Sequence, residues 1–166
     1  MKFKTNDPEK KPKMNKDLYD LFINLIQFEI EKSVFIKSAE KYFDLNGYQD
    51  YDSFFKDIEL DCLKFKDCVC EYLLNRLETL PDFKYPAIDI DFSNPQEIFD
   101  SFASLEANAF DKLNELAKKA LDVTDMSALA YLFDKLNKFD HIACRAREAV
   151  KNNQPIRDLP QPPMPW

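Results

Sequence analysis

Glu106 is the residue whose surroundings in the sequence first require a chemical explanation. At helical spacing its carboxylate lies on the same side as an apolar group made of Phe99, Phe102, Phe110 and Leu113. Burying an unpaired carboxylate is costly, so such a group gains a partner or changes its protonation state. We therefore expect Glu106 to bind a cation, to be neutralised by a basic side chain, or to share a proton with a second acid.

His141 and Cys144 form the second pattern that could do chemistry, because both are zinc-ligand types and lie one helical turn apart. The other ligands of a tetrahedral site are not visible at matching spacing, and Cys68 and Cys70 would point to different faces of a helix. We interpret the thiols as small core side chains, free in a reducing compartment. The expected location is therefore cytoplasmic.

The composition favours an all-α protein. The 166 residues contain a single Gly, which tight hairpins would use and long helices exclude, and 45% of them are hydrophobic. The first 16 residues hold six Lys against Asp7 and Glu9, so with a net charge of -7 the rest of the chain carries about -11. An acidic body argues against a nucleic-acid-binding surface on the fold and is compatible with attracting cations. The sequence has no apolar stretch of membrane-spanning length.

Helical periodicity identifies the elements that must position Glu106. It covers four segments of similar length, at residues 15–45, 52–80, 95–121 and 125–151. The third helix is expected to begin at Pro95, a favoured first helical residue, with Asn94 as its N-cap. Gly47 can end the first helix.

The connection between the second and third segments decides the topology. Residues 81–94 reach about 46 Å when extended, which is the length of the bundle, so these two helices can run parallel. The prediction is an all-α four-helix bundle over residues 15–151, with one long crossover between the second and third helices. Residues 1–14 are expected to form a basic disordered arm, and residues 152–166, which hold five Pro, an extended tail.

Over residues 15–151 the chain resembles a non-haem bacterial-type ferritin. Glu29 and Glu106 fall where that family places the single glutamates of its first and third helices, and Tyr42 lies near the aromatic residue that closes its first helix. The resemblance implies a ferritin-like bundle whose cofactor is iron, held between Glu29 and Glu106. Haem is not expected, because residues 52–80 contain no Met to serve as its axial ligand.

The chain departs from the family pattern at the other iron ligands. By an ungapped count, Cys62 and Phe65 occupy the Glu-x-x-His positions of the second helix, and Phe139 and Ile142 the polar pair of the fourth. Two ligands remain of the expected five or six, so any ferroxidase activity should be weak or absent. A slip of one turn would make Glu59 a ligand beside Cys62. Asp61 and Asp140 could also reach the site if the helices rotate, and His141 is a further candidate ligand.

The resemblance also implies a homo-oligomeric shell of about 24 copies, into which iron enters through acidic channels. Asp122 and Asp125 lie close to the expected channel, although helix capping is the alternative role for Asp125. The expected function is an iron-binding and iron-storage cage subunit. The alternative is a ferritin-derived bundle that acts as a protein-interaction or DNA-binding module, although for the Lys-rich arm we favour a solvated segment over DNA contact.

Overall fold

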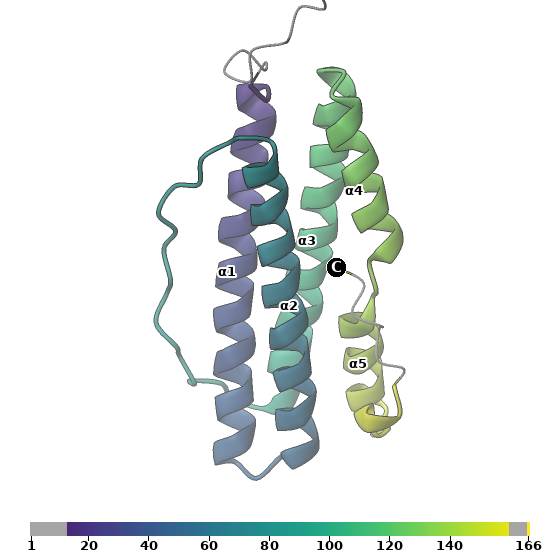
Figure 1. Cartoon of the computed structure of the whole chain (residues 1–166). Coiled ribbons are helices and arrows are strands. Elements are labelled where there is room, and N and C mark those ends of the chain that lie inside the picture. The colour runs from purple at the N-terminus through teal and green to yellow at the C-terminus, as the bar shows by residue number, and fades with distance from the viewer. Residues whose placement is uncertain (1–12, 160–165) are drawn as a thin grey trace, which may run out of the picture.

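The computed structural model describes residues 13–159 and residue 166, and these residues contain helices and no strands (Figure 1). The elements in chain order are α1 (Lys16–Leu45), α2 (Gln49–Asn75), α3 (Pro95–Asp122), α4 (Met126–Lys138), α5 (Ile142–Lys151) and the short 3-10 helix η2 (Ile156–Asp158).

A side-chain cap precedes three of these helices, α1, α3 and α4. The Asn15 side chain accepts hydrogen bonds from Asp17 N and Leu18 N, which satisfies N–H groups that lack a partner inside α1. Asn94 does the same for α3 by accepting from Glu97 N, and Pro95 follows at the first helical position, as predicted.

The first two helices are joined by a tight turn. Gly47 occupies the left-handed region with φ +78°, where a residue without a side chain is favoured. The second helix begins at Gln49 and ends at Asn75, rather than spanning the predicted 52–80. It ends early because Leu77 turns to φ 60°, which is incompatible with a continuing right-handed helix.

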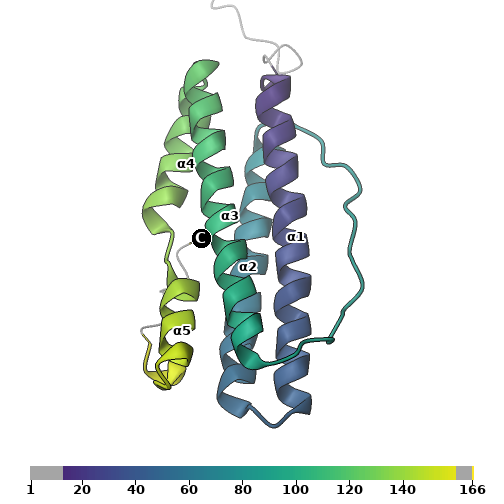
Figure 2. The same cartoon turned by 180° about the vertical axis from the view of Figure 1, so that it is seen from behind.

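The crossover spans residues 76–94, rather than the predicted 81–94, and runs the length of α1 on the outside of the bundle (Figures 1 and 2). The Tyr19 hydroxyl donates to Thr79 O at 2.6 Å near one end of α1, and Asp89 N donates to Ser38 Oγ at 3.1 Å near the other. Because the crossover returns the chain to the far end, α2 and α3 run parallel (Figure 2). The predicted topology is confirmed.

The predicted continuous fourth helix is wrong, since residues 125–151 fold as two helices, α4 and α5, separated at 139–141. In an uninterrupted helix Ala143 N–H would bond to the Phe139 carbonyl. In the structure it donates instead to Glu106 Oε2 at 3.1 Å. The break therefore supplies a hydrogen-bond donor to a carboxylate in the interior.

The core consists of two clusters, one toward each end of the bundle. The first includes Phe22 and Phe65, and the second includes Phe55, Phe99 and Phe102. Buried polar side chains, among them those of Glu29 and Glu106, lie near the level at which the clusters meet. This level of the bundle contains the candidate site.

The Lys-rich arm lies outside the described residues except for its last two. Of these, Met14 packs against the first core cluster and donates through its backbone N–H to Glu78 Oε1 at 2.9 Å. In the tail, Ile156 is buried within η2, a helical turn that the Pro-rich sequence did not suggest. Within the described part of the chain, no helix combines the length and apolar character needed to span a membrane.

Candidate functional site

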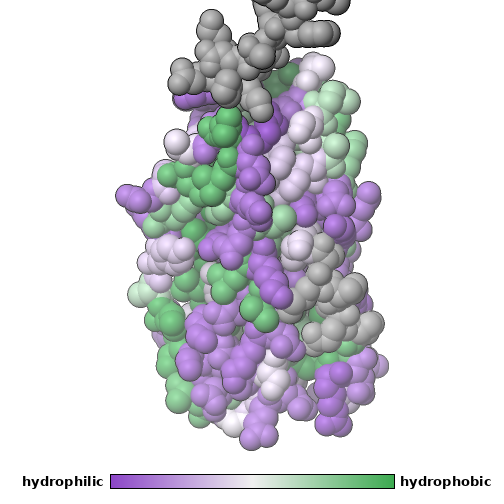
Figure 3. Space-filling model, viewed as in Figure 1, coloured by the Kyte–Doolittle hydropathy of each residue, from purple (hydrophilic) through white to green (hydrophobic). Residues whose placement is uncertain are grey.

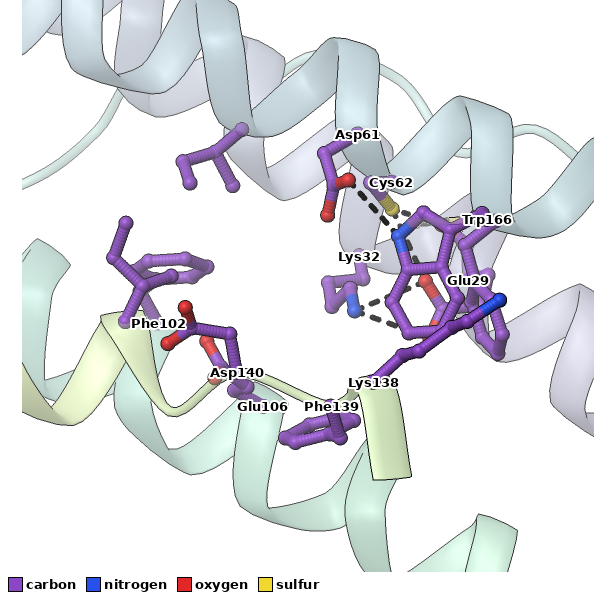
Figure 4. Close-up of a pocket in the computed structure, with 13 residues that line it drawn as sticks. Glu29, Lys32, Asp61, Cys62, Phe102, Glu106, Lys138, Phe139, Asp140 and Trp166 are labelled. Atoms are coloured by element: carbon purple, nitrogen blue, oxygen red, sulfur yellow. Dashed lines mark hydrogen bonds and ion pairs between the residues drawn. The ribbon is translucent and has the colours of Figure 1, made fainter. Parts of the chain in front are cut away.

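A cavity of about 50 Å³ lies between α1, α2, α3 and the α4–α5 break (Figure 4). Apolar side chains from both core clusters line it, including Phe65 and Phe102, together with Trp166. The charged residues of its wall are Glu29, Lys32, Asp61, Glu106, Lys138 and Asp140. The structure thus brings four of the candidate ligands to one cavity: Glu29, Asp61, Glu106 and Asp140.

Glu29 is almost fully buried, with 1% of its surface exposed, and it has a basic partner. The Lys32 ammonium, one turn further along α1, lies 2.9 Å from Glu29 Oε2 and 3.1 Å from Oε1. The Cys62 thiol of α2 donates to Glu29 Oε2 at 3.1 Å. The carboxylate is therefore paired and hydrogen-bonded within the chain.

The protonation of these partners follows from that arrangement. Burial by itself would lower the pKa of Lys32, but attraction to Glu29, the hydrogen bond to it and smaller effects of Cys62 and Glu106 together raise the pKa above its ordinary value. Burial raises the pKa of the Cys62 thiol well above its ordinary value, and the Glu29 charge adds to the increase. Near neutral pH Lys32 is thus an ammonium and Cys62 a neutral thiol.

Glu106 faces the same cavity from α3 and is 7% exposed. Its Oε2 accepts from Ala143 N at the start of α5, where the helix dipole favours negative charge, while its buried Oε1 has no hydrogen-bond partner in the described chain. Burial raises the pKa of Glu106 to about 7, against the opposing effects of Lys32 and the Ala143 N–H. Glu106 thus lies close to half protonation near neutral pH.

The two remaining acids of the cavity are engaged elsewhere. Asp61 Oδ1 accepts from the Trp166 indole N–H at 2.9 Å (Figure 4). Asp140 forms an ion pair with Arg145, whose Nη2 lies 2.6 Å from Oδ1, in an orientation that does not qualify as a hydrogen bond. A cation entering the cavity would have to compete with Trp166 for one acid and with Arg145 for the other.

Glu59 and His141 do not line the cavity. Glu59 lies on another face of the α1–α2 pair, where Lys37 Nζ is 3.6 Å from Glu59 Oε2 and 3.0 Å from Glu40 Oε2. His141 is exposed, and its ring packs on Phe110 with the ring centres 5.3 Å apart. Neither side chain is placed beside Glu29 or Glu106.

The two candidate channel residues differ in their surroundings. Asp125 caps α4 by accepting from Ala128 N at 3.0 Å. It also forms a bidentate ion pair with Arg76, whose Nη2 lies 2.9 Å from Oδ2 and whose Nη1 lies 3.2 Å from Oδ1. Although burial opposes the change, Arg76 holds the pKa of Asp125 below its ordinary value. Asp122 is exposed, next to Lys118 and Lys119.

Solved structures share this architecture. A crystal structure of a PmFTN variant soaked in iron matches with a TM-score of 0.70 and 19% identity, covering 84% of this chain and 87% of that one. An open-pore ferritin from the hyperthermophilic archaeon Archaeoglobus fulgidus matches with a TM-score of 0.78 and 15% identity, over 84% and 88%. The chain has the ferritin fold. At the level of sequence, no protein-family model and no curated protein matches it.

The site within this ferritin fold differs from a closed metal centre. Among residues 13–159 and 166, no three or more His, Cys, Asp and Glu side chains are arranged so that they could hold a metal ion. Glu29 has Lys32 and Cys62 as partners, and Glu106 has a backbone N–H. The chemistry that these groups can perform without further ligands is proton exchange and weak cation binding.

Sequence reasoning missed two residues of this site. Lys32 could have been predicted as the partner of Glu29, because it follows Glu29 at a spacing that places both on one helix face. Trp166 gave no comparable signal, since contact between residues 61 and 166 depends on the tertiary path of the tail.

Proposed function

We propose that this chain is the subunit of a cytoplasmic shell that binds and stores iron and has little or no ferroxidase activity of its own. The observation that carries the proposal is the Lys32–Glu29 ion pair inside the cavity of a ferritin fold. The fold supplies the expectation of iron, and the ion pair explains why oxidation should be slow. The four free cysteines are compatible with a reducing compartment.

The charges in the cavity oppose binding of two iron ions together. An ammonium paired with Glu29 places a positive charge where a metal would need negative ligands, and it is poorly screened in a buried site. Cys62 is neutral and Phe65 offers no ligand atom. Oxidation through a di-iron pair needs several hard oxygen and imidazole ligands, so the remaining carboxylates fit weak binding of single ions better.

Storage would then depend on the shell as a whole. The chain has a formal charge of -7, which attracts cations to its surface. Assembly is supported by large apolar side chains exposed on the crossover, where Tyr85 is 65%, Ile88 54% and Ile90 43% exposed. Apolar and polar residues are also interspersed over the face of the bundle shown in Figure 3. Exposed apolar side chains of this size are typical of protein contacts.

The first test is oxidation of Fe(II) in air by the purified protein, followed by ferric absorbance. We expect a rate close to that of buffer alone, and the same rate for Glu106→Ala, because the cavity does not oxidise iron. A fast initial phase that Glu106→Ala abolishes would overturn the proposal.

The second test is mass together with retained iron. A shell of 24 copies of the 19.6 kDa chain would elute at about 470 kDa, and after iron loading the metal should co-elute with it in elemental analysis. A small oligomer that carries no iron would contradict storage and favour the protein-interaction module.

A further inference from the structure

Trp166 lies against the cavity wall although it is 105 positions from its hydrogen-bond partner in the sequence. Its indole N–H donates to Asp61 Oδ1 at 2.9 Å (Figure 4). Its ring centre is 4.5 Å from that of Phe65. The Lys135 ammonium lies 5.7 Å from the indole centre. Trp166 therefore makes a hydrogen bond, an aromatic ring contact and a cation–π contact at one place.

These contacts match the chemistry of an indole. Its N–H is only a donor and needs an acceptor, which Asp61 supplies with a charged oxygen. Its large ring gains from packing beside another aromatic ring, and its electron-rich face attracts a cation. Asp61, Phe65 and Lys135 supply one group for each requirement.

The groups are also held in place by their own neighbours. Phe65 is 4% exposed within the first core cluster, and Lys135 is 5% exposed. The Lys135 ammonium lies 5.0 Å from the Tyr131 ring centre and 3.5 Å from Asp134. A buried lysine whose stem is fixed in this way loses little further freedom when an aromatic ring docks against it.

We propose that Asp61, Phe65 and Lys135 form a binding site for an indole side chain, and that Trp166 of the same chain is its occupant. Docking places the indole in the wall of the cavity that contains Glu29, Lys32 and Glu106. It also occupies Asp61, an acid that would otherwise be available to a cation. This inference does not depend on the proposed function, because its test involves no iron.

Fluorescence provides a direct test, because Trp166 is the only Trp in the sequence. In the native full-length protein we expect emission at shorter wavelength than in the urea-unfolded chain, and a several-fold lower acrylamide quenching constant. Asp61→Ala should raise that constant at least about twofold, because the indole N–H loses its charged acceptor.

Asp67→Ala is the matched control, because Asp67 lies on the same helix but its side chain is 72% exposed and pairs with the neighbouring Lys66. It should leave the emission and quenching of the native protein unchanged. Far-UV circular dichroism of both variants checks that the bundle is intact. Native Trp166 quenched as readily as in the unfolded chain, or equal quenching in folded Asp61→Ala and Asp67→Ala, would overturn the proposal.

Discussion

The Lys32 ammonium lies 2.9 Å from the Glu29 carboxylate, and both side chains line the cavity that Glu106 faces from α3. The pair neutralises the more deeply buried acid within a single helix. Among residues 13–159 and 166, no basic side chain forms an ion pair with Glu106, whose Oε2 accepts from the Ala143 N–H. Of the two acids predicted to bind a metal, Glu29 is thus stabilised by an ion pair and Glu106 by a backbone hydrogen bond. Each interaction has a measurable consequence.

Removing the Lys32 charge should destabilise the fold. In Lys32→Met the side chain keeps most of its volume, but Glu29 loses its cation and remains buried. Breaking a buried pair in this way costs about 3 kcal/mol. Chemical denaturation at fixed protein concentration measures the loss in free energy of unfolding.

Lys138→Met serves as the control for that measurement. Lys138 pairs with Asp134 at 3.1 Å, but these side chains are 38% and 50% exposed, so the loss should stay below about 1 kcal/mol. The double variant Glu29→Gln with Lys32→Met should recover part of the lost stability, because neither position then holds an unpaired buried charge. Equal effects of Lys32→Met and Lys138→Met would show that the buried pair is not stabilising.

Glu106 should make stability depend on pH. Its folded pKa is raised from 4.5 to about 7, so between these values the native state binds more protons than the unfolded chain. The contribution of Glu106 therefore favours folding at low pH and is lost as pH rises through 7. Lys32, Asp140 and Arg145 are the charged groups that act on this carboxyl group.

Glu106→Gln isolates that contribution. Relative to the wild type, this variant should gain stability as pH rises from 4.5 to 7, by up to about 3 kcal/mol at about 1.4 kcal/mol per pKa unit. Denaturation curves at a series of pH values measure the gain. The exposed Glu115→Gln on the same helix should show no such trend. A stability difference between Glu106→Gln and the wild type that is constant across this range would contradict the raised pKa.

The bundle and its crossover could be predicted because their signals are local. Asn94, Pro95 and Gly47 act on the backbone near their own positions, and apolar periodicity marks the helices. The partition of the fourth segment into α4 and α5 could not be predicted in this way. No Gly or Pro marks the break between them in the sequence. The break leaves the Ala143 N–H free to donate to Glu106, which is 37 positions earlier in the chain.

The candidate site was predictable only in part, because some of its contacts join residues that are far apart in the sequence. The register of two helices is enough to place Glu29 and Glu106 in one layer of the bundle. Which partner neutralises each acid depends on side-chain packing across the layer, and the sequence left a basic side chain and a shared proton as alternatives. The structure selects Lys32 for Glu29.

Cys62 should be the least reactive thiol of the native protein. Burial and the Glu29 charge both raise its pKa, so the thiolate that reacts with alkylating agents is scarce near neutral pH. Labelling with iodoacetamide, followed by mass spectrometry of peptides, should modify Cys144, which is only partly buried, at least about tenfold faster. Labelling of Cys62 at the rate of Cys144 in the folded protein would contradict this environment.

Asp125 should be important for stability whether or not it also guides ions. Asp125→Ala removes both the cap of α4 and the ion pair with Arg76, for a loss of about 2 kcal/mol, of which the cap supplies about 1. The exposed Asp122→Ala, three positions earlier, should change the free energy of unfolding by less than about 0.5 kcal/mol. Thermal or chemical denaturation compares the two variants. If Asp122 acts only at a channel, its variant should slow iron uptake without a stability loss, whereas equal destabilisation by both would refute the structural role assigned to Asp125.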